Sequence, residues 1–246
     1  MNCLSWNCRG ARGRRFPSLM NDVIREYNVG LLCLMETHIS GDCAWKVARK
    51  ISLDKCFMVQ AQGQAGGIWF MWDSNRWFVD ILEHTAHLIH IKINEGDNLW
   101  FCTFVYASPH PQGRIPLWRD ISRLASFVDG AWLVMGDFNA ILHPYERVGS
   151  ISQTFFRGVQ AFRSCINQTS LMDMGYNGAP FTWRRGNLFE RLDRALVSYE
   201  WCVRFPDASL SHLNPLKSDH TPILVRFSTN MSAIPIVDPF ALRLHG

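Results

Sequence analysis

Several apolar, strand-like segments of this sequence end directly before, or begin directly after, a residue that can bind a metal ion or move a proton. An amide, an acid or a tyrosine closes three of these segments, and a Gly-Asp-Phe-Asn sequence closes a fourth. Acids stand at the start of two more, one of them followed by a histidine. The residues in question are Asn7, Glu36, Tyr106, Asp137, Asn139, Asp193, Asp219 and His220.

If each sheet contains strands running in both directions, the ends of some strands lie beside the starts of others. All these polar groups then lie along one edge of the sheets, which we call the rim. Four carboxylates gathered there repel one another, so the cluster requires a divalent cation or a paired histidine. Oxygen ligands favour Mg²⁺ or Mn²⁺ over zinc. Carboxylates, a divalent cation and a histidine that donates to a phosphoryl oxygen together suit hydrolysis of a phosphate ester.

Each of these residues alone also has an ordinary structural explanation. Glu36 is typical of a solvated loop after a strand, and Tyr106 suits a core position equally well. Gly-Asp-x-Asn is a common turn sequence, because Gly, Asp and Asn favour turns for local reasons. Ser218-Asp219-His220 suits a simple cap of a strand. The functional interpretation therefore depends on the joint occurrence and the order of the residues.

The elements that must position these residues alternate along the chain, with runs rich in β-branched and aromatic residues indicating strands. Strands are predicted at 2–7, 31–35, 67–72, 77–82, 87–93, 99–106, 131–136, 191–197, 208–213 and 222–228. Helical spacing predicts helices at 15–27, 42–51, 114–127 and 157–168. The pattern indicates one layered α/β domain over residues 1–228 and a poorly structured C-terminal tail over 229–246.

Composition limits the classes of protein to which this chain can belong. The chain has 246 residues, of which 48% are hydrophobic and 19% charged, which excludes whole-chain disorder. No run approaches the roughly 18 apolar residues of a membrane span, and arginines interrupt the N-terminal region where a signal peptide needs an apolar stretch. A nuclear or cytoplasmic, intracellular monomer without membrane contact is expected. The formal net charge of +4 is compatible with a polyanionic partner.

Six ordered motifs across residues 2–228 resemble the endonuclease/exonuclease/phosphatase superfamily. They are Ser5-Trp6-Asn7-Cys8-Arg9-Gly10, Leu34-Met35-Glu36-Thr37, Val105-Tyr106-Ala107, Gly136-Asp137-Phe138-Asn139, Arg191-Leu192-Asp193-Arg194 and Ser218-Asp219-His220-Thr221-Pro222-Ile223. Within it, the chain most resembles the apurinic/apyrimidinic-type endonuclease domain of plant non-LTR (LINE-like) retrotransposons. That closer resemblance rests on Trp6-Asn7-Cys8-Arg9-Gly10, Met35-Glu36-Thr37-His38 and Gly178-Ala179-Pro180-Phe181-Thr182-Trp183.

The resemblance implies a four-layer α/β sandwich, with two mixed β-sheets packed face to face and helices on the outside. It also implies a Mg²⁺-dependent (or Mn²⁺-dependent) endonuclease that nicks one DNA strand and leaves a 3′-hydroxyl. A reverse transcriptase region normally follows in such elements, whereas this chain stops soon after the nuclease motifs. Glu36 would ligate the metal with Asn7 beside it, and Asp219 would complete the acid cluster on the metal side.

The same resemblance implies roles for the remaining rim residues. Asp137 would orient and deprotonate the attacking water, and Asn139 would help to place that water. Tyr106 would contact the scissile phosphate. Asp193 would hydrogen-bond His220 and hold it, protonated, against the phosphate oxygens.

Basic residues near the rim are candidates for contact with DNA phosphates, which supply affinity without sequence readout. Many superfamily members carry an acid where this chain has Arg9, so a second ligand there is not expected and Arg9 is free to meet a phosphate. One basic cluster comprises Arg9, Arg12, Arg14 and Arg15, and a second comprises Arg184, Arg185, Arg191 and Arg194. Trp183, inside the second cluster, is a candidate base-stacking platform. Solvated basic loops remain the alternative for both clusters.

Two other functions remain open from the sequence. One is a phosphatase or phosphodiesterase acting on a small molecule or lipid headgroup, because the superfamily includes phosphatases. The other is a catalytically silent, nucleic-acid-binding retroelement remnant. A domain restricted to repair of abasic sites is less well supported, because the closer resemblance is to retroelement domains.

Overall fold

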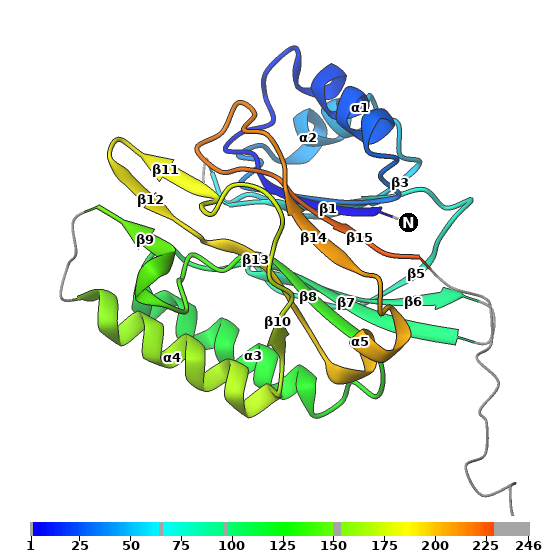
Figure 1. Cartoon of the computed structure of the whole chain (residues 1–246). Helices are drawn as coiled ribbons and strands as arrows, with labels where there is room; N and C mark the ends of the chain where they lie inside the picture. The colour runs from blue at the N-terminus through cyan, green and yellow to red at the C-terminus, as the bar shows by residue number, and fades with distance from the viewer. Residues whose placement is uncertain (1, 64–65, 96–97, 150–153, 229–246) are drawn as a thin grey trace, which may run out of the picture.

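Two six-stranded mixed sheets face each other at the centre of the molecule, and helices cover their outer surfaces (Figure 1). The computed structural model describes residues 2–63, 66–95, 98–149 and 154–228. This arrangement confirms the predicted four-layer α/β sandwich. The predicted tail at 229–246 lies outside the described residues, and the domain boundary at 228 stays a prediction.

The first sheet has the strand order β14-β15-β1-β2-β4-β3. Only β1 and β2 run parallel, and the other neighbours are antiparallel. Its strands are β1 (Asn2–Asn7), β2 (Leu31–Met35), β3 (Lys55–Val59), β4 (Ile68–Trp72), β14 (Ser209–His212) and β15 (Ile223–Arg226). Helices α1 (Phe16–Glu26) and α2 (Gly41–Ala48) lie over this sheet (Figure 1).

The second sheet has the order β10-β13-β8-β7-β6-β5, with β7 and β8 parallel. Its strands are β5 (Phe78–His84), β6 (Leu88–Glu95), β7 (Asn98–Tyr106), β8 (Trp132–Asp137), β10 (Met172–Asp173) and β13 (Asp193–Val197). Its outer face carries α3 (Ile115–Ala125), which follows the 3₁₀ turn η1 (Pro111–Arg114), and α4 (Thr154–Thr169) (Figure 1). Helix α3 buries Leu117, Trp118, Ile121 and Leu124 at helical spacing.

A small third sheet projects from the sandwich. It consists of β11 (Trp183–Arg185), β12 (Leu188–Glu190) and β9 (Arg147–Val148), which follows the 3₁₀ turn η2 (Pro144–Glu146). The β11–β12 hairpin extends away from the two large sheets (Figure 1). A short helix, α5 (Tyr199–Arg204), packs near β8. Within the described residues, no helix combines the length and apolar character needed to cross a membrane.

Every strand and helix predicted from the sequence has an observed counterpart whose ends agree within three residues. The central core is the interface between the sheets, where buried apolar side chains such as Met35, Phe70 and Phe104 meet. The rings of Phe70 and Phe104 lie 5.0 Å apart across this interface. The two remaining apolar layers lie between each sheet and its helices, and they account for the near-continuous hydrophobic runs of the inner strands.

Strand pairing brings the polar rim together. Tyr106 at the end of β7 is in register with Asp137 at the end of β8, because these strands run parallel. Asp193 at the start of β13 is also in register with Asp137, because β13 runs antiparallel to β8. The expectation that strand ends of opposite direction share one rim is therefore correct.

Candidate active site

Asp137 is the centre of the site and is fully buried. Its carboxylate accepts hydrogen bonds from both neighbouring amide side chains. Asn7, from the other sheet, donates through Nδ2 to Asp137 Oδ2 at 2.9 Å. Asn139 donates its backbone N–H to Oδ1 at 2.8 Å and its side-chain Nδ2 to Oδ2 at 2.9 Å. The carboxylate is thus held from both sheets of the sandwich.

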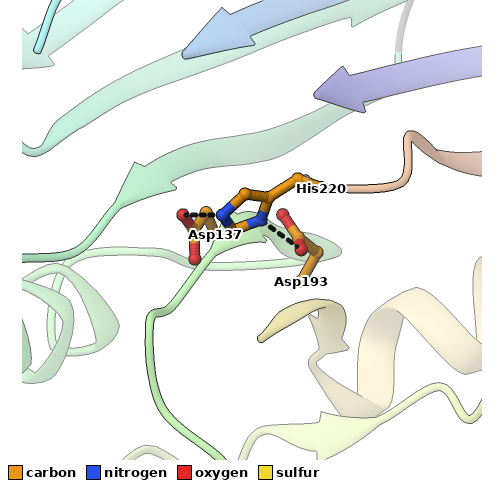
Figure 2. A group of neighbouring side chains, drawn as sticks. All are labelled: Asp137, Asp193 and His220. Carbon is orange, nitrogen blue, oxygen red and sulfur yellow. Dashed lines mark hydrogen bonds and ion pairs between the residues drawn. The ribbon is translucent and has the colours of Figure 1, made fainter. Parts of the chain in front are cut away.

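His220 lies between two carboxylates, as Figure 2 shows. Its Nδ1 is 2.9 Å from Asp193 Oδ2, and its Nε2 is 3.7 Å from Asp137 Oδ2. Asp193 is fixed in turn because its backbone N–H donates to Thr182 Oγ1 at 2.9 Å. The ring therefore presents one nitrogen to an orienting acid and the other to Asp137.

Burial and charge shift the pKa values of this pair in ways that suit proton transfer. Burial raises the pKa of Asp137 to about 7, against the opposing charge of His220. Burial alone would lower the pKa of His220, but the carboxylates of Asp193 and Asp137 outweigh it and raise that pKa to about 9. Near neutral pH, His220 is consequently a cation, and Asp137 is close to its own titration point.

Glu36 stands at the end of β2, with one oxygen in the hydrogen-bond network and the other turned toward His38 and Arg9. Its Oε1 accepts from Tyr106 Oη at 3.0 Å and from Asn7 Nδ2 at 2.9 Å. Its Oε2 is 3.3 Å from His38 Nε2 and 3.7 Å from Arg9 Nε. Burial and the Glu36 charge raise the pKa of Tyr106, so its hydroxyl stays protonated.

Four residues around the site adopt positive φ angles although none is glycine. They are Arg9 at 46°, Glu36 at 51°, His38 at 58° and Asn139 at 46°. Such left-handed conformations are disfavoured for most residues with a Cβ atom and are typical of functional sites. Gly136 in β8, at 140°, has no room for any side chain, because a Cβ would lie 2.2 Å from Val105 O.

The donor set fits a divalent cation. Two acids, Glu36 and Asp137, lie on either side of the Asn7 amide, and hard oxygen donors are the ligands that Mg²⁺ and Mn²⁺ prefer. Asn7 presents its amide nitrogen to both acids, and its Oδ1 accepts from the backbone N–H of Arg9 at 3.3 Å. Ligation through the Asn7 oxygen therefore requires the amide to turn over.

Among the described residues, one compact group of possible metal ligands is Asp137, Asp193 and His220. A protonated imidazole has no free lone pair for a metal, so with His220 protonated this group suits an ion-paired hydrogen-bond array better than a metal site. The metal-ligand roles of Glu36, Asn7 and Asp219 stay predictions.

Asp219 lies at the same rim, and both of its carboxylate oxygens already have partners. Its Oδ1 is 2.7 Å from Arg9 Nε, and its Oδ2 accepts from Trp183 Nε1 at 2.9 Å. Arg9 thus stands between Asp219 and Glu36, the position at which many superfamily members carry an acid. These contacts engage Nε of Arg9, and the side chain is exposed, so contact between Arg9 and DNA phosphates stays a prediction.

The family model of the Endonuclease/Exonuclease/phosphatase family matches residues 4–220. The chain belongs to this family. Its members hydrolyse phosphate esters with divalent metals, and the match spans all six motifs that predicted the rim up to His220. No curated protein matches the chain.

Solved structures of this endonuclease/exonuclease/phosphatase fold are similar over nearly the whole chain. An AP endonuclease, LMAP, from Leishmania major has a TM-score of 0.71 at 16% identity, covering 91% of this chain and 86% of that one. The endonuclease domain of TRAS1, a telomere-specific non-LTR retrotransposon, has a TM-score of 0.67 at 14% identity, with coverages of 92% and 97%. The 3′ phosphatase NExo from Neisseria, bound to product DNA hairpin, has a TM-score of 0.67 at 16% identity, with coverages of 93% and 99%. At these identities the likeness establishes the fold.

The structure divides the predicted basic clusters of this family member into exposed and buried arginines. Arg12, Arg14 and Arg15 are exposed in the loop after β1, and Arg184 and Arg185 are exposed on β11 beside the half-buried Trp183. Arg191 and Arg194 are 5% and 0% exposed. The expectation that these two arginines flank a DNA groove is wrong, because both side chains are buried and form ion pairs inside the protein.

These ion pairs form a buried network that sequence reasoning missed. Arg194 is 2.9 Å from Glu146 and 2.8 Å from Asp173, and Arg191 is 3.0 Å and 2.7 Å from the same two acids. Arg194 also donates to the carbonyl oxygens of Ala140 and Arg191. The network therefore ties the segment after Asn139 to the segment before Asp193. Asp173, a single acid in the apolar stretch 171–174, was the available signal, and Glu146 gave none.

Proposed function

We propose that this chain is a divalent-metal-dependent DNA endonuclease of the retroelement type, which nicks one strand and leaves a 3′-hydroxyl. The observation that carries the proposal is the buried Asp137 carboxylate, held by Asn7 and Asn139 beside the Asp193–His220 pair. A base poised near neutral pH next to an acid fixed in its cationic form suits hydrolysis of a phosphate ester. The plant LINE-like origin is part of the same proposal.

Asp137 takes the proton of the attacking water in this mechanism. Its pKa of about 7 places it where a general base is most effective at neutral pH. Asn7 and Asn139 hold the carboxylate in place through the bonds to its two oxygens. With the carboxylate immobilised from both sheets, little reorganisation is needed when the water attacks.

His220 and Tyr106 supply hydrogen-bond donors for the phosphate. His220 remains protonated because of Asp193, and its Nε2–H faces the interior of the site toward Asp137. The Tyr106 hydroxyl, now bonded to Glu36, is free to turn to a phosphate oxygen when substrate enters. Both groups stabilise negative charge as it develops on the phosphate oxygens.

Glu36 would hold the divalent cation, Mg²⁺ or Mn²⁺, with Asn7 and Asp219 as further candidates. When bound, such an ion acts as a Lewis acid on the phosphate oxygens. The exposed Arg12 and Arg14 would contact backbone phosphates on one side of the site, and Arg184, Arg185 and Trp183 would contact DNA on the other. A reverse transcriptase of the same element would use the 3′-hydroxyl as primer, and the domain would act as a monomer.

A supercoiled-plasmid nicking assay tests the proposal. The expected result is conversion to open circle in Mg²⁺ or Mn²⁺ and no conversion in EDTA, because the acids of the site need the cation. End-labelling of the product with a polymerase reports the 3′-hydroxyl. A folded protein that leaves plasmid intact but releases phosphate from an inositol phosphate would replace the endonuclease with the small-molecule phosphatase. Binding without either reaction would indicate the silent remnant.

The substitution Glu36→Gln tests the assigned metal ligand. It removes one negative charge while keeping the side-chain shape and the acceptor for Tyr106, so the Mg²⁺ concentration for half-maximal nicking should rise about tenfold or more. Glu26→Gln, which changes an exposed acid at the end of α1, is the matched control. An unchanged metal titration in Glu36→Gln would remove Glu36 from the metal site.

A further inference from the structure

A cavity of about 340 Å³ opens beside Asn139, next to the reaction centre, and arginines dominate its polar lining. Arg9, Arg114, Arg147 and Arg185 reach it from four separate segments of the chain. Glu190 is the single acid among the described lining residues. Four cations around one cavity repel one another, so their convergence points to an anionic ligand.

Two of the four arginines are paired with acids of the same chain. Arg147 pairs with Glu190 at 2.8 Å, and Arg9 pairs with Asp219 at 2.7 Å. Arg185 is exposed on β11, and Arg114 is in none of the ion pairs of the described residues. The cavity therefore keeps two positive charges in excess.

Arg114 is the unusual member because it is only 9% exposed. Its Nε donates to Ser108 O at 2.8 Å and its Nη2 to Pro109 O at 2.7 Å, and both of these partners are neutral carbonyl groups. Burial lowers the pKa of Arg114, against the charges of Asp137 and Glu190. Burying a cation without a carboxylate partner costs free energy unless a bound anion compensates its charge.

The remaining nitrogen of Arg114 is placed to meet such a ligand. A Cβ atom at Gly158 on α4 would lie 3.4 Å from Arg114 Nη1, so the glycine leaves this nitrogen uncrowded. The carbonyl bonds at Nε and Nη2 fix the plane of the guanidinium. A fixed guanidinium plane is well suited to phosphate oxygens, which it binds through paired hydrogen bonds.

We propose that this cavity, through Arg114 and Arg185, binds a second phosphate group of the substrate strand, next to the phosphate that is cleaved. The cavity shares Asn139 with the reaction centre, which places its ligand beside the reacting phosphate and not at a distant surface. The inference rests on the proposed nuclease function, since it assigns a subsite of the same active site. The group is either an internal diester or a terminal phosphate at a strand break.

The test uses duplex oligonucleotides with one mapped cleavage position, in which each nearby phosphate is replaced singly by an uncharged methylphosphonate. One replacement beside the cleavage position should raise KM of the wild-type protein about tenfold or more, the loss expected for a charge-assisted contact. Arg114→Met and Arg185→Met should raise KM on unmodified DNA and lose most of their sensitivity to that one replacement. Arg114→Lys should recover part of it.

Arg119→Met, which changes an exposed arginine of α3, is the matched control and should keep the wild-type pattern. If Arg114→Met fails to fold, Arg185→Met still tests the proposal, because Arg185 is exposed and its substitution leaves the core unchanged. A second duplex, broken beside the cleavage position with or without a terminal phosphate, distinguishes the two sources. A terminal phosphate that restores KM would identify the strand break.

A wild-type protein that nicks DNA but ignores every single methylphosphonate would overturn the subsite while leaving the nuclease intact. A protein that nicks nothing would overturn the proposed function. In that case fluorescence anisotropy with the same duplexes in EDTA still decides the subsite. Selective weakening by one methylphosphonate in wild type, absent in Arg185→Met, would support it, and equal binding to all duplexes would refute it.

Discussion

Asp137→Asn should lower the nicking rate by about 10²- to 10⁴-fold, the range lost when a general base is removed. The amide cannot accept a proton from water, whereas Glu36 and the exposed basic surface remain in place. DNA affinity measured in EDTA should therefore change by less than about twofold. A plasmid nicking time course and an anisotropy titration on the same preparation measure the two effects.

The matched control for this substitution is Asp207→Asn, which changes an exposed acid in the turn after α5 and should nick at the wild-type rate. Circular dichroism must show that Asp137→Asn is folded, because the new amide nitrogen faces the donors on Asn7 and Asn139. Comparable nicking by the variant and the wild type would refute the role of Asp137 as the base.

The sequence predicted the inner strands and the covering helices well because their patterns come directly from burial. Strands β2 and β8 are buried at every position, so each gives an apolar run, which in β8 ends at Asp137 of the site. Helix α3 buries one face, so it gives a helical period. The sequence of such an element therefore shows directly which of its positions are buried.

The missed elements lack such a pattern. Edge strand β3 (Lys55–Val59) is partly exposed along its length, and the hairpin strands β11 and β12 are three residues each and polar or half-buried. These strands exist because a partner pairs with them, as β4 does with β3. Pairing between distant segments leaves little trace in the local sequence.

The same distinction holds for the site. Motif order predicted which residues meet at the rim, because strand ends carry them there. It did not predict that Arg9 is held by Asp219 or that the Asn7 amide turns its nitrogen to the acids. Nor did it distinguish the buried Arg194 from the exposed Arg184, because the residue type alone does not show whether an arginine is buried. Such differences are set by tertiary partners.

Arg194→Met should destabilise the fold by about 3–5 kcal/mol, the loss typical of removing one member of a buried ion pair. Glu146, almost fully buried, would lose the partner at 2.9 Å, and Asp173 would lose one at 2.8 Å. Urea unfolding at neutral pH measures the change. Arg119→Met, on the exposed surface of α3, should stay within about 0.5 kcal/mol of wild type.

The ion-pair network of Arg194 also makes the free energy of unfolding depend on pH. Burial alone would raise the pKa of Glu146 and Asp173. The charge of Arg194 opposes this, and the pKa of both acids is lowered in the folded protein. Lowered folded-state values mean that the stabilisation is complete above the unfolded-state pKa of about 4 and is lost as pH falls further. Arg194→Met should flatten the unfolding free energy over this acid range. Parallel curves for variant and wild type between pH 5 and 3 would show that Arg194 does not control the two acids.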